Sequence, residues 1–311
     1  MNSFVRLLKN DLYKCFKKKS FLLLSLILIC GIAVSGFTNY RLYNDDTWKE
    51  MLTAQNNEMV KYVESTEGVN ERIRKYYDTK IDENNYCIEN GIAPSNFLND
   101  VSKMFSVDTI LEMVFIMLFG SFLAEEYTCK AFNSTMRSPN KKGSIFLSQF
   151  VAGIILVFAL VTILLLTSIM VAGIKNGFSE IVAPSIYSKN GVFIETTVFV
   201  RIIRTLLMYL PQYILNLGIV FLIAHVTRNP IATAALPLFL ALSGTILSDF
   251  LTKYKLGVLW PYVHTNLNQY FEQSQYYSYM SLGKSLVVVA LYVLAGYAIA
   301  YLTTRKKALY C

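Results

Sequence analysis

The sequence predicts an all-α polytopic membrane protein with six transmembrane helices, an N-terminal interfacial amphipathic helix and an external helical insertion. Of its 311 residues, 54% are hydrophobic and only 16% are charged, whereas soluble domains carry about 25% charged residues. The deficit comes from apolar runs of about 18 residues or more, each long enough to cross a hydrocarbon core of about 30 Å. Lysine and arginine are concentrated in some of the segments between these runs, which sets the orientation.

An amphipathic segment opens the chain. Phe4, Leu8 and Leu12 fall near helical spacing within residues 1–19, with lysine and arginine on the other side. This pattern is typical of a basic helix that lies in a membrane interface. An ordinary basic flank that only sets orientation explains the same residues, and the two roles are compatible. The first predicted span follows at 20–38.

A polar segment at 39–106 separates the first span from the second. Its central part, 40–105, holds 12 acidic and 8 basic residues. Apolar residues at helical spacing predict two amphipathic helices, the first through Trp48, Leu52, Met59 and Val63 and the second through Val69, Ile73 and Ile81. Gly91 and Pro94 interrupt this pattern before a short third helix near Asn96–Met104. A small helical insertion is therefore expected here.

Five further spans are predicted downstream. They are 107–124, 145–174, 205–226, 231–249 and 285–303. The segments between and after them are a polar loop at 125–144, a loop with an amphipathic approach from Phe193 at 175–204, a turn at 227–230, an aromatic-rich segment at 250–284 and a tail at 304–311. Pro211 interrupts the fourth span, and Pro237 and Gly244 lie inside the fifth.

The distribution of charge predicts which side of the membrane each segment occupies. Six spans place both termini on one side, together with loop 125–144 and the turn at 227–230. This side holds fourteen lysine or arginine residues against Asp11, Glu125 and Glu126, a net charge of +11 in a chain whose total is +8. Because cytoplasmic loops carry the excess of lysine and arginine, this side is predicted to be cytoplasmic in a plasma membrane, and 39–106 extracellular. The bias accounts for the basic net charge, so no nucleic-acid partner is expected.

The cysteines predict neither a metal site nor an external disulfide within the chain. The five of them form no Cys-x-x-Cys pair and no metal-ligand spacing. Only Cys87 falls in a predicted extracellular segment, where it is either a free thiol or a link between two copies.

One short motif resembles the end of a phosphate-binding loop, the sequence SLGKS at 281–285. Such a loop requires a glycine five residues before its second glycine, and this chain has Ser278 there. The chain is therefore not expected to hydrolyse ATP, or to be an enzyme by itself.

Three other motifs resemble those of intramembrane metalloproteases that cleave prenylated proteins. They are Glu125-Glu126-x-x-x-Lys130, Phe221-x-x-x-His225 and His264-x-x-x-Asn268. In such a site a glutamate and two histidines would activate a water molecule. The charge bias places Glu126 and His225 on the cytoplasmic side and His264 on the external side, beyond the reach that catalysis needs. An enzyme of this type is the rival hypothesis, and two unrelated interfacial histidines are the plainer one.

Two charged pairs lie near predicted outer membrane boundaries. Asp108 and Glu112 are one helical turn apart at the start of the second span, and Arg201 and Arg204 approach the fourth. Charges at such depth are often functional. The pairs either face water just outside the core, line an external vestibule, or bind each other.

The overall plan resembles permease subunits of the type-two ABC exporter family, which share the amphipathic N-terminal helix, six spans and cytoplasmic termini. The family also has a patterned loop after the second span. Glu126, Ser138, Pro139 and Ile145 match that pattern, whereas Lys142, Gln149 and the pair Lys130-Ala131 depart from it. The resemblance covers the whole chain in layout.

The resemblance implies that loop 125–144 contains a coupling helix that docks on a separate ATPase subunit. The implied coupling residues are Glu125, Glu126, Tyr127, Lys130, Phe132, Met136 and Arg137. Two ATPase copies would bind ATP and magnesium, so this chain itself would bind no cofactor, and a second copy or homologous permease would complete the membrane part. The implied cargo is an antimicrobial peptide or an amphipathic, lipid-like compound. A plain basic loop that only sets topology, and a sensor or scaffold subunit without transport, remain alternatives.

Overall fold

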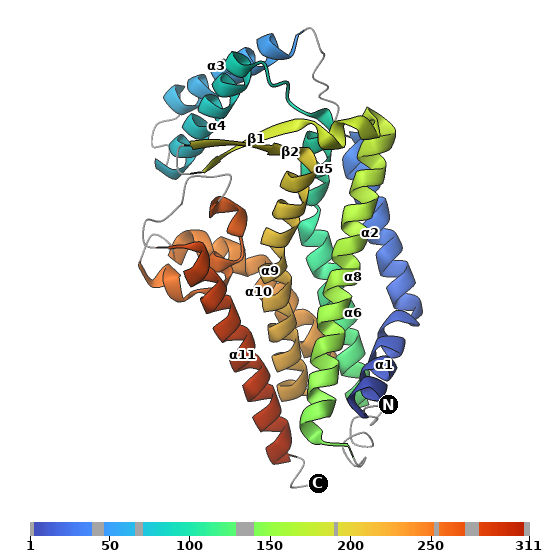
Figure 1. Ribbon diagram of the computed structural model, residues 1–311. Coiled ribbons are helices and arrows are strands. Elements are labelled where there is room, and N and C mark those ends of the chain that lie inside the picture. The colour runs from blue at the N-terminus through green and yellow to red at the C-terminus, as the bar shows by residue number, and fades with distance from the viewer. Residues whose placement is uncertain are drawn as a thin grey trace.

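Long helices run side by side through the middle of the molecule (Figure 1). The computed structural model describes residues 3–38, 47–65, 71–128, 140–189, 192–251, 255–270 and 280–307. The long helices are α2 (Lys19–Thr38), α6 (Asp108–Thr128), α8 (Lys142–Asn176), α9 (Val198–Thr227), α10 (Pro230–Leu251) and α11 (Leu282–Lys307). Both termini lie at one end of this bundle, here called the terminal end, and the opposite end is called the hairpin end.

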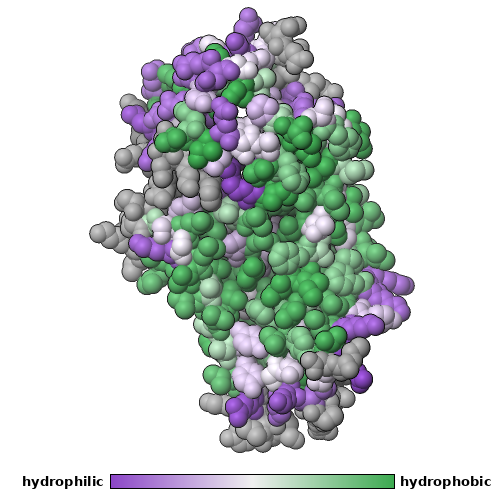
Figure 2. All heavy atoms as spheres, viewed as in Figure 1, coloured by the Kyte–Doolittle hydropathy of each residue, from purple (hydrophilic) through white to green (hydrophobic). Residues whose placement is uncertain are grey.

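Five stretches of the described chain are long and apolar enough to cross a membrane. They are Lys19–Phe37, Asn96–Thr128, Lys142–Asn176, Val198–Thr227 and Leu282–Arg305. Helix α10 contributes a shorter apolar helical stretch, Pro230–Gly244. Large apolar side chains are exposed along these helices, including Leu22, Ile231 and Ile246. Figure 2 shows hydrophobic residues covering the middle of the visible face, with hydrophilic residues gathered at both ends. Such a belt matches hydrocarbon contact, and the chain is a mostly helical, membrane-embedded protein.

The first helix lies at the terminal end and packs on the bundle. Helix α1 spans Ser3–Phe16 and contacts both α8 and α6. A short bend leads into α2, where the rings of Phe16 and Phe21 meet edge to face at 4.9 Å. The face of α1 that turns inward carries Asp11 and Cys15, both buried. Polar as well as apolar residues of this amphipathic helix therefore contact the bundle.

Three helices build the hairpin end together with a small sheet. Helices α3 (Trp48–Ser65) and α4 (Glu71–Asn90) pack against each other, and α5 (Asn96–Phe105) leads into α6. Gly91 ends α4 with a φ of +67°, a conformation that glycine adopts at little cost. The side chain of Ser95 then caps α5 by accepting a hydrogen bond from the Leu98 backbone at 3.1 Å. A separate small core of Trp48, Leu52, Cys87 and Ile186 holds this layer together.

A β-hairpin replaces part of the loop and amphipathic approach expected at 175–204. Strands β1 (Pro184–Lys189) and β2 (Val192–Thr197) pair antiparallel, and Lys189 lies opposite Val192. After β2, α9 begins at Val198, where the Thr197 hydroxyl caps the backbone of Val200. The approach from Phe193 is thus a strand before it is a helix. The dipeptide Asn190-Gly191 between alternating apolar residues is a strong sequence signal for a two-residue hairpin and would have revealed it.

Helix α9 runs through the centre of the bundle and lies very close to α11. A Cβ atom added at Gly218 would be 3.2 Å from the Val293 Cα, and one added at Gly296 would be 3.2 Å from the Gly218 carbonyl oxygen. Small residues at such crossings let two membrane helices pack backbone to backbone. Pro211 lies inside α9 and removes one backbone donor from its ladder.

Short 3₁₀ turns close the hairpin end between α10 and α11. They are η2 (Lys255–Leu259), η3 (Pro261–His264) and η4 (Leu267–Tyr270). A fourth 3₁₀ turn, η1 (Phe178–Val182), lies earlier in the chain, between α8 and β1. The Trp260 indole donates to the Gly244 carbonyl of α10 at 3.1 Å. A Cβ atom at Gly244 would lie 2.6 Å from the Tyr262 ring. Gly244 inside the predicted fifth span is thus the place where η3 packs onto α10.

Candidate functional site

Two ion pairs fasten α1 to the last turn of α6. Lys14 Nζ lies 2.5 Å from Glu126 Oε1, and Lys18 Nζ lies 2.7 Å from Glu125 Oε2. Glu126 is only 5% exposed, whereas the Glu125 side chain is 58% exposed. The inner pair is partly desolvated and therefore matters more to the fold than the outer one.

A buried hydrogen bond fastens the same helix to α8. The Ser148 hydroxyl donates to Asp11 Oδ2 at 2.7 Å. Burial raises the pKa of the Asp11 carboxyl to about 6, while Ser148 and Lys14 act in the opposite direction. One face of α1 therefore contacts two helices, α8 through Asp11 and α6 through Lys14.

A group of rings at the end of α9 completes this region. The rings of Tyr127 and His225 meet edge to face with their centroids 5.8 Å apart, and the centroid of the Phe146 ring of α8 lies 4.7 Å from that of His225. The Arg228 guanidinium lies over the Tyr127 ring at 5.6 Å. Arg228 caps α9 in the left-handed region with a φ of 52°. We call this region the terminal corner: Asp11, Lys14, Glu126, Tyr127, Phe146, Ser148, His225 and Arg228, where α1, α6, α8 and α9 meet.

The predicted coupling residues divide between this corner and an undescribed stretch. Glu125, Glu126 and Tyr127 form the end of α6, and of these only Glu125 is largely exposed. Glu126 and Tyr127 point into the bundle instead of forming an outer contact surface. Lys130, Phe132, Met136 and Arg137 lie outside the described residues. The terminal corner is where the chain leaves α6, at Thr128, and α8 begins again nearby at Lys142.

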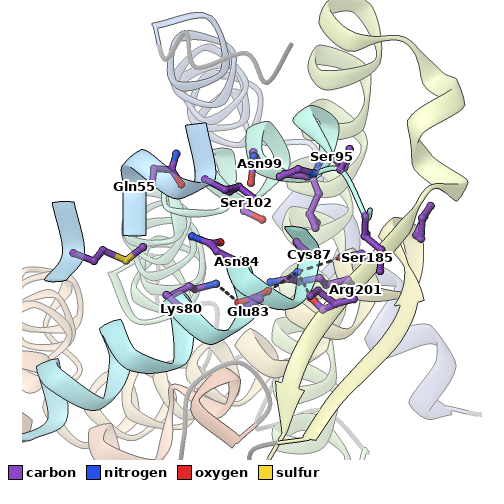
Figure 3. Close-up of a pocket in the computed structure, with 18 of the residues that line it drawn as sticks. Gln55, Lys80, Glu83, Asn84, Cys87, Ser95, Asn99, Ser102, Ser185 and Arg201 are labelled. Atoms are coloured by element: carbon purple, nitrogen blue, oxygen red, sulfur yellow. Dashed lines mark hydrogen bonds and ion pairs between the residues drawn. The ribbon is translucent and has the colours of Figure 1, made fainter. Parts of the chain in front are cut away.

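A pocket of about 290 Å³ opens at the hairpin end. Its wall comes from α3, α4, α5, the turn before α5, β1 and the start of α9 (Figure 3). Glu83 lies between two cations, with Lys80 Nζ at 2.7 Å and Arg201 Nη1 at 3.5 Å. Tyr76, Tyr77 and Met59 add apolar surface to the same wall. The pocket therefore combines a net positive polar side with an aromatic side.

The arginines predicted to line a vestibule belong to this end of the molecule. Arg201 donates to the Ile186 carbonyl at 2.6 Å and to the Ser185 hydroxyl at 3.2 Å, in addition to its pair with Glu83. Arg204 stacks over the Tyr187 ring, with its guanidinium carbon 3.7 Å from the ring centroid. Both arginines thus hold the hairpin to α9, and Arg201 also holds α4.

The acidic pair predicted for the same vestibule lies at a different level. Glu112 accepts hydrogen bonds from Gln212 and Asn216 of α9, the first at 3.0 Å. Gln212 follows Arg201 by eleven residues on α9, which is about 16 Å of helix. Asp108 accepts from the Thr109 backbone at 2.7 Å in the first turn of α6. The acidic pair and the arginine pair therefore contact different partners, and no ion pair between them is found among the described residues.

Of the three protease-like motifs, those of Glu126 and His225 meet at the terminal corner, where the ring of Tyr127 beside Glu126 contacts His225, whereas the motif of His264 lies apart from both. His264 contacts Ser285 through Nδ1 at 2.9 Å and the Val258 carbonyl through Nε2 at 2.7 Å. Its neighbour Tyr262 bonds to Asn216, which precedes His225 by nine residues or about 14 Å along α9. Burial lowers the pKa of His264. Across the described ranges, no three His, Cys, Asp or Glu side chains are grouped to hold one metal ion.

Comparison with protein-family models, curated proteins and solved structures gave no match for this chain. What bears on function is therefore the geometry of the terminal corner and of the pocket at the hairpin end.

Proposed function

We propose that this chain is the membrane-spanning permease subunit of an ATP-driven exporter of the type-two ABC class. In this proposal α10 is a sixth span, both termini and loop 125–144 are cytoplasmic, and the terminal end faces the cytoplasm. The clustering of lysine and arginine in these segments supports the orientation. The hairpin end then faces outward from the plasma membrane.

The observation that carries the proposal is the terminal corner. The loop implied to dock on the ATPase joins α6 to α8, and both of those helices are tied to α1 at the corner through Glu126 and Ser148. The end of α9 is held there too, through Tyr127. A push on the loop would therefore move four helices together, which suits a switch between two packed arrangements.

The rest of the machine would be supplied by other subunits. Two ATPase copies bind ATP and magnesium in this proposal, and their closure moves loop 125–144. The permease itself works as a pair, with a second copy or a homologous permease, and binds no cofactor of its own.

The hairpin-end pocket supports a role in cargo recognition. Its aromatic side suits an apolar group, and the cations Lys80 and Arg201 beside Glu83 suit a polar or anionic head. We therefore propose that the cargo is an amphipathic molecule, such as an antimicrobial peptide or a lipid-like compound. Export of it would protect the cell.

Co-purification tests the proposal. The tagged chain is extracted from its native membrane in mild detergent and assayed for a bound subunit with ATPase activity. We expect an ATPase at one copy per permease, lost in Arg137→Glu. Arg305→Glu makes the same charge change in the exposed last turns of α11 and should leave the complex intact. Wild-type protein that carries no ATPase, or equal retention in both variants, would contradict the proposal.

A further inference from the structure

A carboxyl group lies inside the bundle, away from both sites described above. Glu112 is on α6, one turn after its first residue, and is 5% exposed. Its neighbours on the helix, Leu111 and Phe115, are fully buried. Gln212 Nε2 donates to Oε2 at 3.0 Å, and Asn216 Nδ2 donates to Oε1. The two amides are four residues apart on α9 and so lie on one face of that helix.

The hydrogen-bonded chain continues beyond α9. Tyr262 of η3 donates its hydroxyl hydrogen to Asn216 Oδ1 at 3.0 Å, and both residues are buried. The Tyr262 ring in turn lies against Gly244 of α10. Glu112, Asn216 and Tyr262 therefore connect α6, α9 and η3 through a single line of polar groups, seated on α10.

The groups that face Glu112 do not neutralise a negative charge. Asp108 lies on its own helix, and the phenols of Tyr213 and Tyr262 face it from α9 and η3. In the ion pairs and hydrogen bonds of the described residues, no lysine, arginine or histidine from α2, α8, α9 or α10 contacts it. A buried carboxylate without a cation is costly, and taking up a proton removes that cost.

A protonated Glu112 needs an acceptor for its new O–H, and Asn216 can provide one. A half-turn of the Asn216 amide exchanges its nitrogen and oxygen, which occupy nearly equivalent positions. Oδ1 then accepts from the Glu112 O–H, and Nδ2 donates to the Tyr262 hydroxyl oxygen. The ionised form uses the opposite direction, from Tyr262 through Asn216 to Glu112. The same three side chains thus satisfy the carboxyl group in both states, which a purely structural hydrogen bond does not require.

We propose that Glu112, Asn216 and Tyr262 form a proton-binding site within the membrane part of the protein. Glu112 takes up and releases the proton, and Asn216 is the positioning residue that serves both states by reversing its amide. Because the site is built only from this chain, the inference does not depend on an ATPase partner.

Infrared difference spectroscopy on the purified full chain in lipid tests the proposal. Spectra are recorded while the buffer is changed between about pH 5 and about pH 9, a range in which an ordinary exposed carboxyl stays ionised almost throughout. We expect a carbonyl band of a protonated carboxylic acid that appears on acidification. All proteins compared carry Asp11→Asn, because the buried carboxyl of Asp11, with a pKa of about 6, would titrate in the same range. In that background the band should be absent from Glu112→Gln, which keeps the size of the side chain and, after the Asn216 amide turns, its hydrogen bonds. Asp108→Asn should keep the band.

The positioning role has its own readout. Asn216→Leu removes the amide while keeping the branched shape and the number of heavy atoms, so the ionised form loses a donor and the midpoint of the band should move upward by about one pH unit or more. A titration of the band that is the same with and without Glu112→Gln in the Asp11→Asn background, or no such band in Asp11→Asn alone, would overturn the site. An unmoved midpoint in a folded Asn216→Leu variant would remove Asn216 from it.

Discussion

At the scale of single residues, contacts between distant parts of the sequence give charged side chains their roles. Glu126 reads as a loop residue in the sequence, yet Lys14, which is 112 positions away, holds it at 2.5 Å inside the terminal corner. Asp11 looks like an isolated acid on a basic helix, but it is buried against α8, where the Ser148 hydroxyl donates a hydrogen bond to its carboxylate. The inward face of α1 is therefore polar as well as apolar.

We predict that the docking of α1 weakens as pH rises towards neutrality. Burial raises the pKa of Asp11 to about 6 from an ordinary 3.8, so the folded state binds more protons than the unfolded state between these values. The contribution of Asp11 to the free energy of unfolding therefore falls as pH rises from about 4 to about 6. The total loss is at most on the order of 3 kcal/mol, and the contribution is constant above that range. Asp11→Asn should abolish the slope and slow the opening of α1 at neutral pH.

Hydrogen exchange of the amides of Ser3–Phe16 measures this effect, with Asp11→Asn as the reference for the intrinsic pH dependence of exchange. Parallel exchange profiles for wild type and variant would show that Asp11 does not titrate in this range.

A second prediction concerns the ion pair between Lys14 and Glu126. Lys14→Glu and Glu126→Lys each place like charges together next to a buried position, and each should cost about 1–3 kcal/mol. The double swap should recover most of that loss, and thermal unfolding of all four proteins gives the coupling energy. Lys18 and Glu125, whose carboxylate is exposed, serve as the matched pair, with an expected coupling below about 1 kcal/mol. Additive losses at Lys14 and Glu126 would argue against the pairing.

At the scale of elements, α9 organises the molecule. It receives the hairpin at its start, holds Glu112 in its middle, packs on α11 at Gly218 and ends in the terminal corner. A helix with so many different contacts can carry a change from one end of the bundle to the other. Its internal Pro211, next to Gln212, marks the level where its backbone ladder is interrupted.

We predict that Gly296→Leu separates α9 from α11. Even a Cβ atom there lies 3.2 Å from the Gly218 carbonyl oxygen, so a larger side chain cannot be accommodated without moving a backbone. The expected cost is about 1–3 kcal/mol, seen as a lower thermal unfolding temperature in detergent. Gly283→Leu is the control on the same helix, because nothing lies within 4 Å of a Cβ at Gly283. Equal stability of the two variants would contradict the close packing.

The ties between α4 and α9 yield a prediction about the thiol of Cys87. Burial raises the pKa of this thiol to about 11 from an ordinary 9.0, so at a given pH it should react with maleimide about a hundredfold more slowly than an ordinary exposed thiol. Arg201→Met leaves Glu83 without its partner on α9 and should loosen α4, speeding labelling. Lys103→Met, which removes a half-buried cation of α5 that pairs with Asp100 and not with α4, should leave the rate unchanged. Rapid labelling of Cys87 in the wild type would show that this layer is already open.

At the scale of the whole molecule, an apolar belt separates two polar ends of different character. The terminal end has the basic segments and the terminal corner, and the hairpin end has the pocket and the small sheet (Figures 1 and 2). We predict that reporter fusions at residue 70 and at residue 135 label opposite sides of the membrane. In the sequence, residue 70 falls between α3 and α4, which lie at the hairpin end, and residue 135 falls between α6 and α8, whose neighbouring ends, Thr128 and Lys142, lie at the terminal end. Labelling on the same side would contradict the orientation.

Much of the architecture follows from the order of residues alone. Length and apolarity mark α2, α6, α8, α9 and α11 as able to span a membrane, because a hydrocarbon layer demands about 20 consecutive apolar residues. Gly91 ends α4 because it adopts a positive φ at little cost, and Pro94 disfavours helix at the residue before it, ahead of α5. The hairpin was predictable from Asn190-Gly191, and the amphipathic approach expected from Phe193 begins in the strand that ends at Thr197.

Which side chains meet depends on how the helices pack. Helices such as α6 and α11 are apolar on all sides, so their sequences carry no preferred face and no axial offset relative to α9. The pairing of Lys14 with Glu126, and the line from Glu112 through Asn216 to Tyr262, depend on those rotations and offsets. Composition along the chain is enough to locate the passages from polar to apolar surroundings. Burial and hydrogen bonding between remote segments depend on packing, and packing placed the charged groups of this protein.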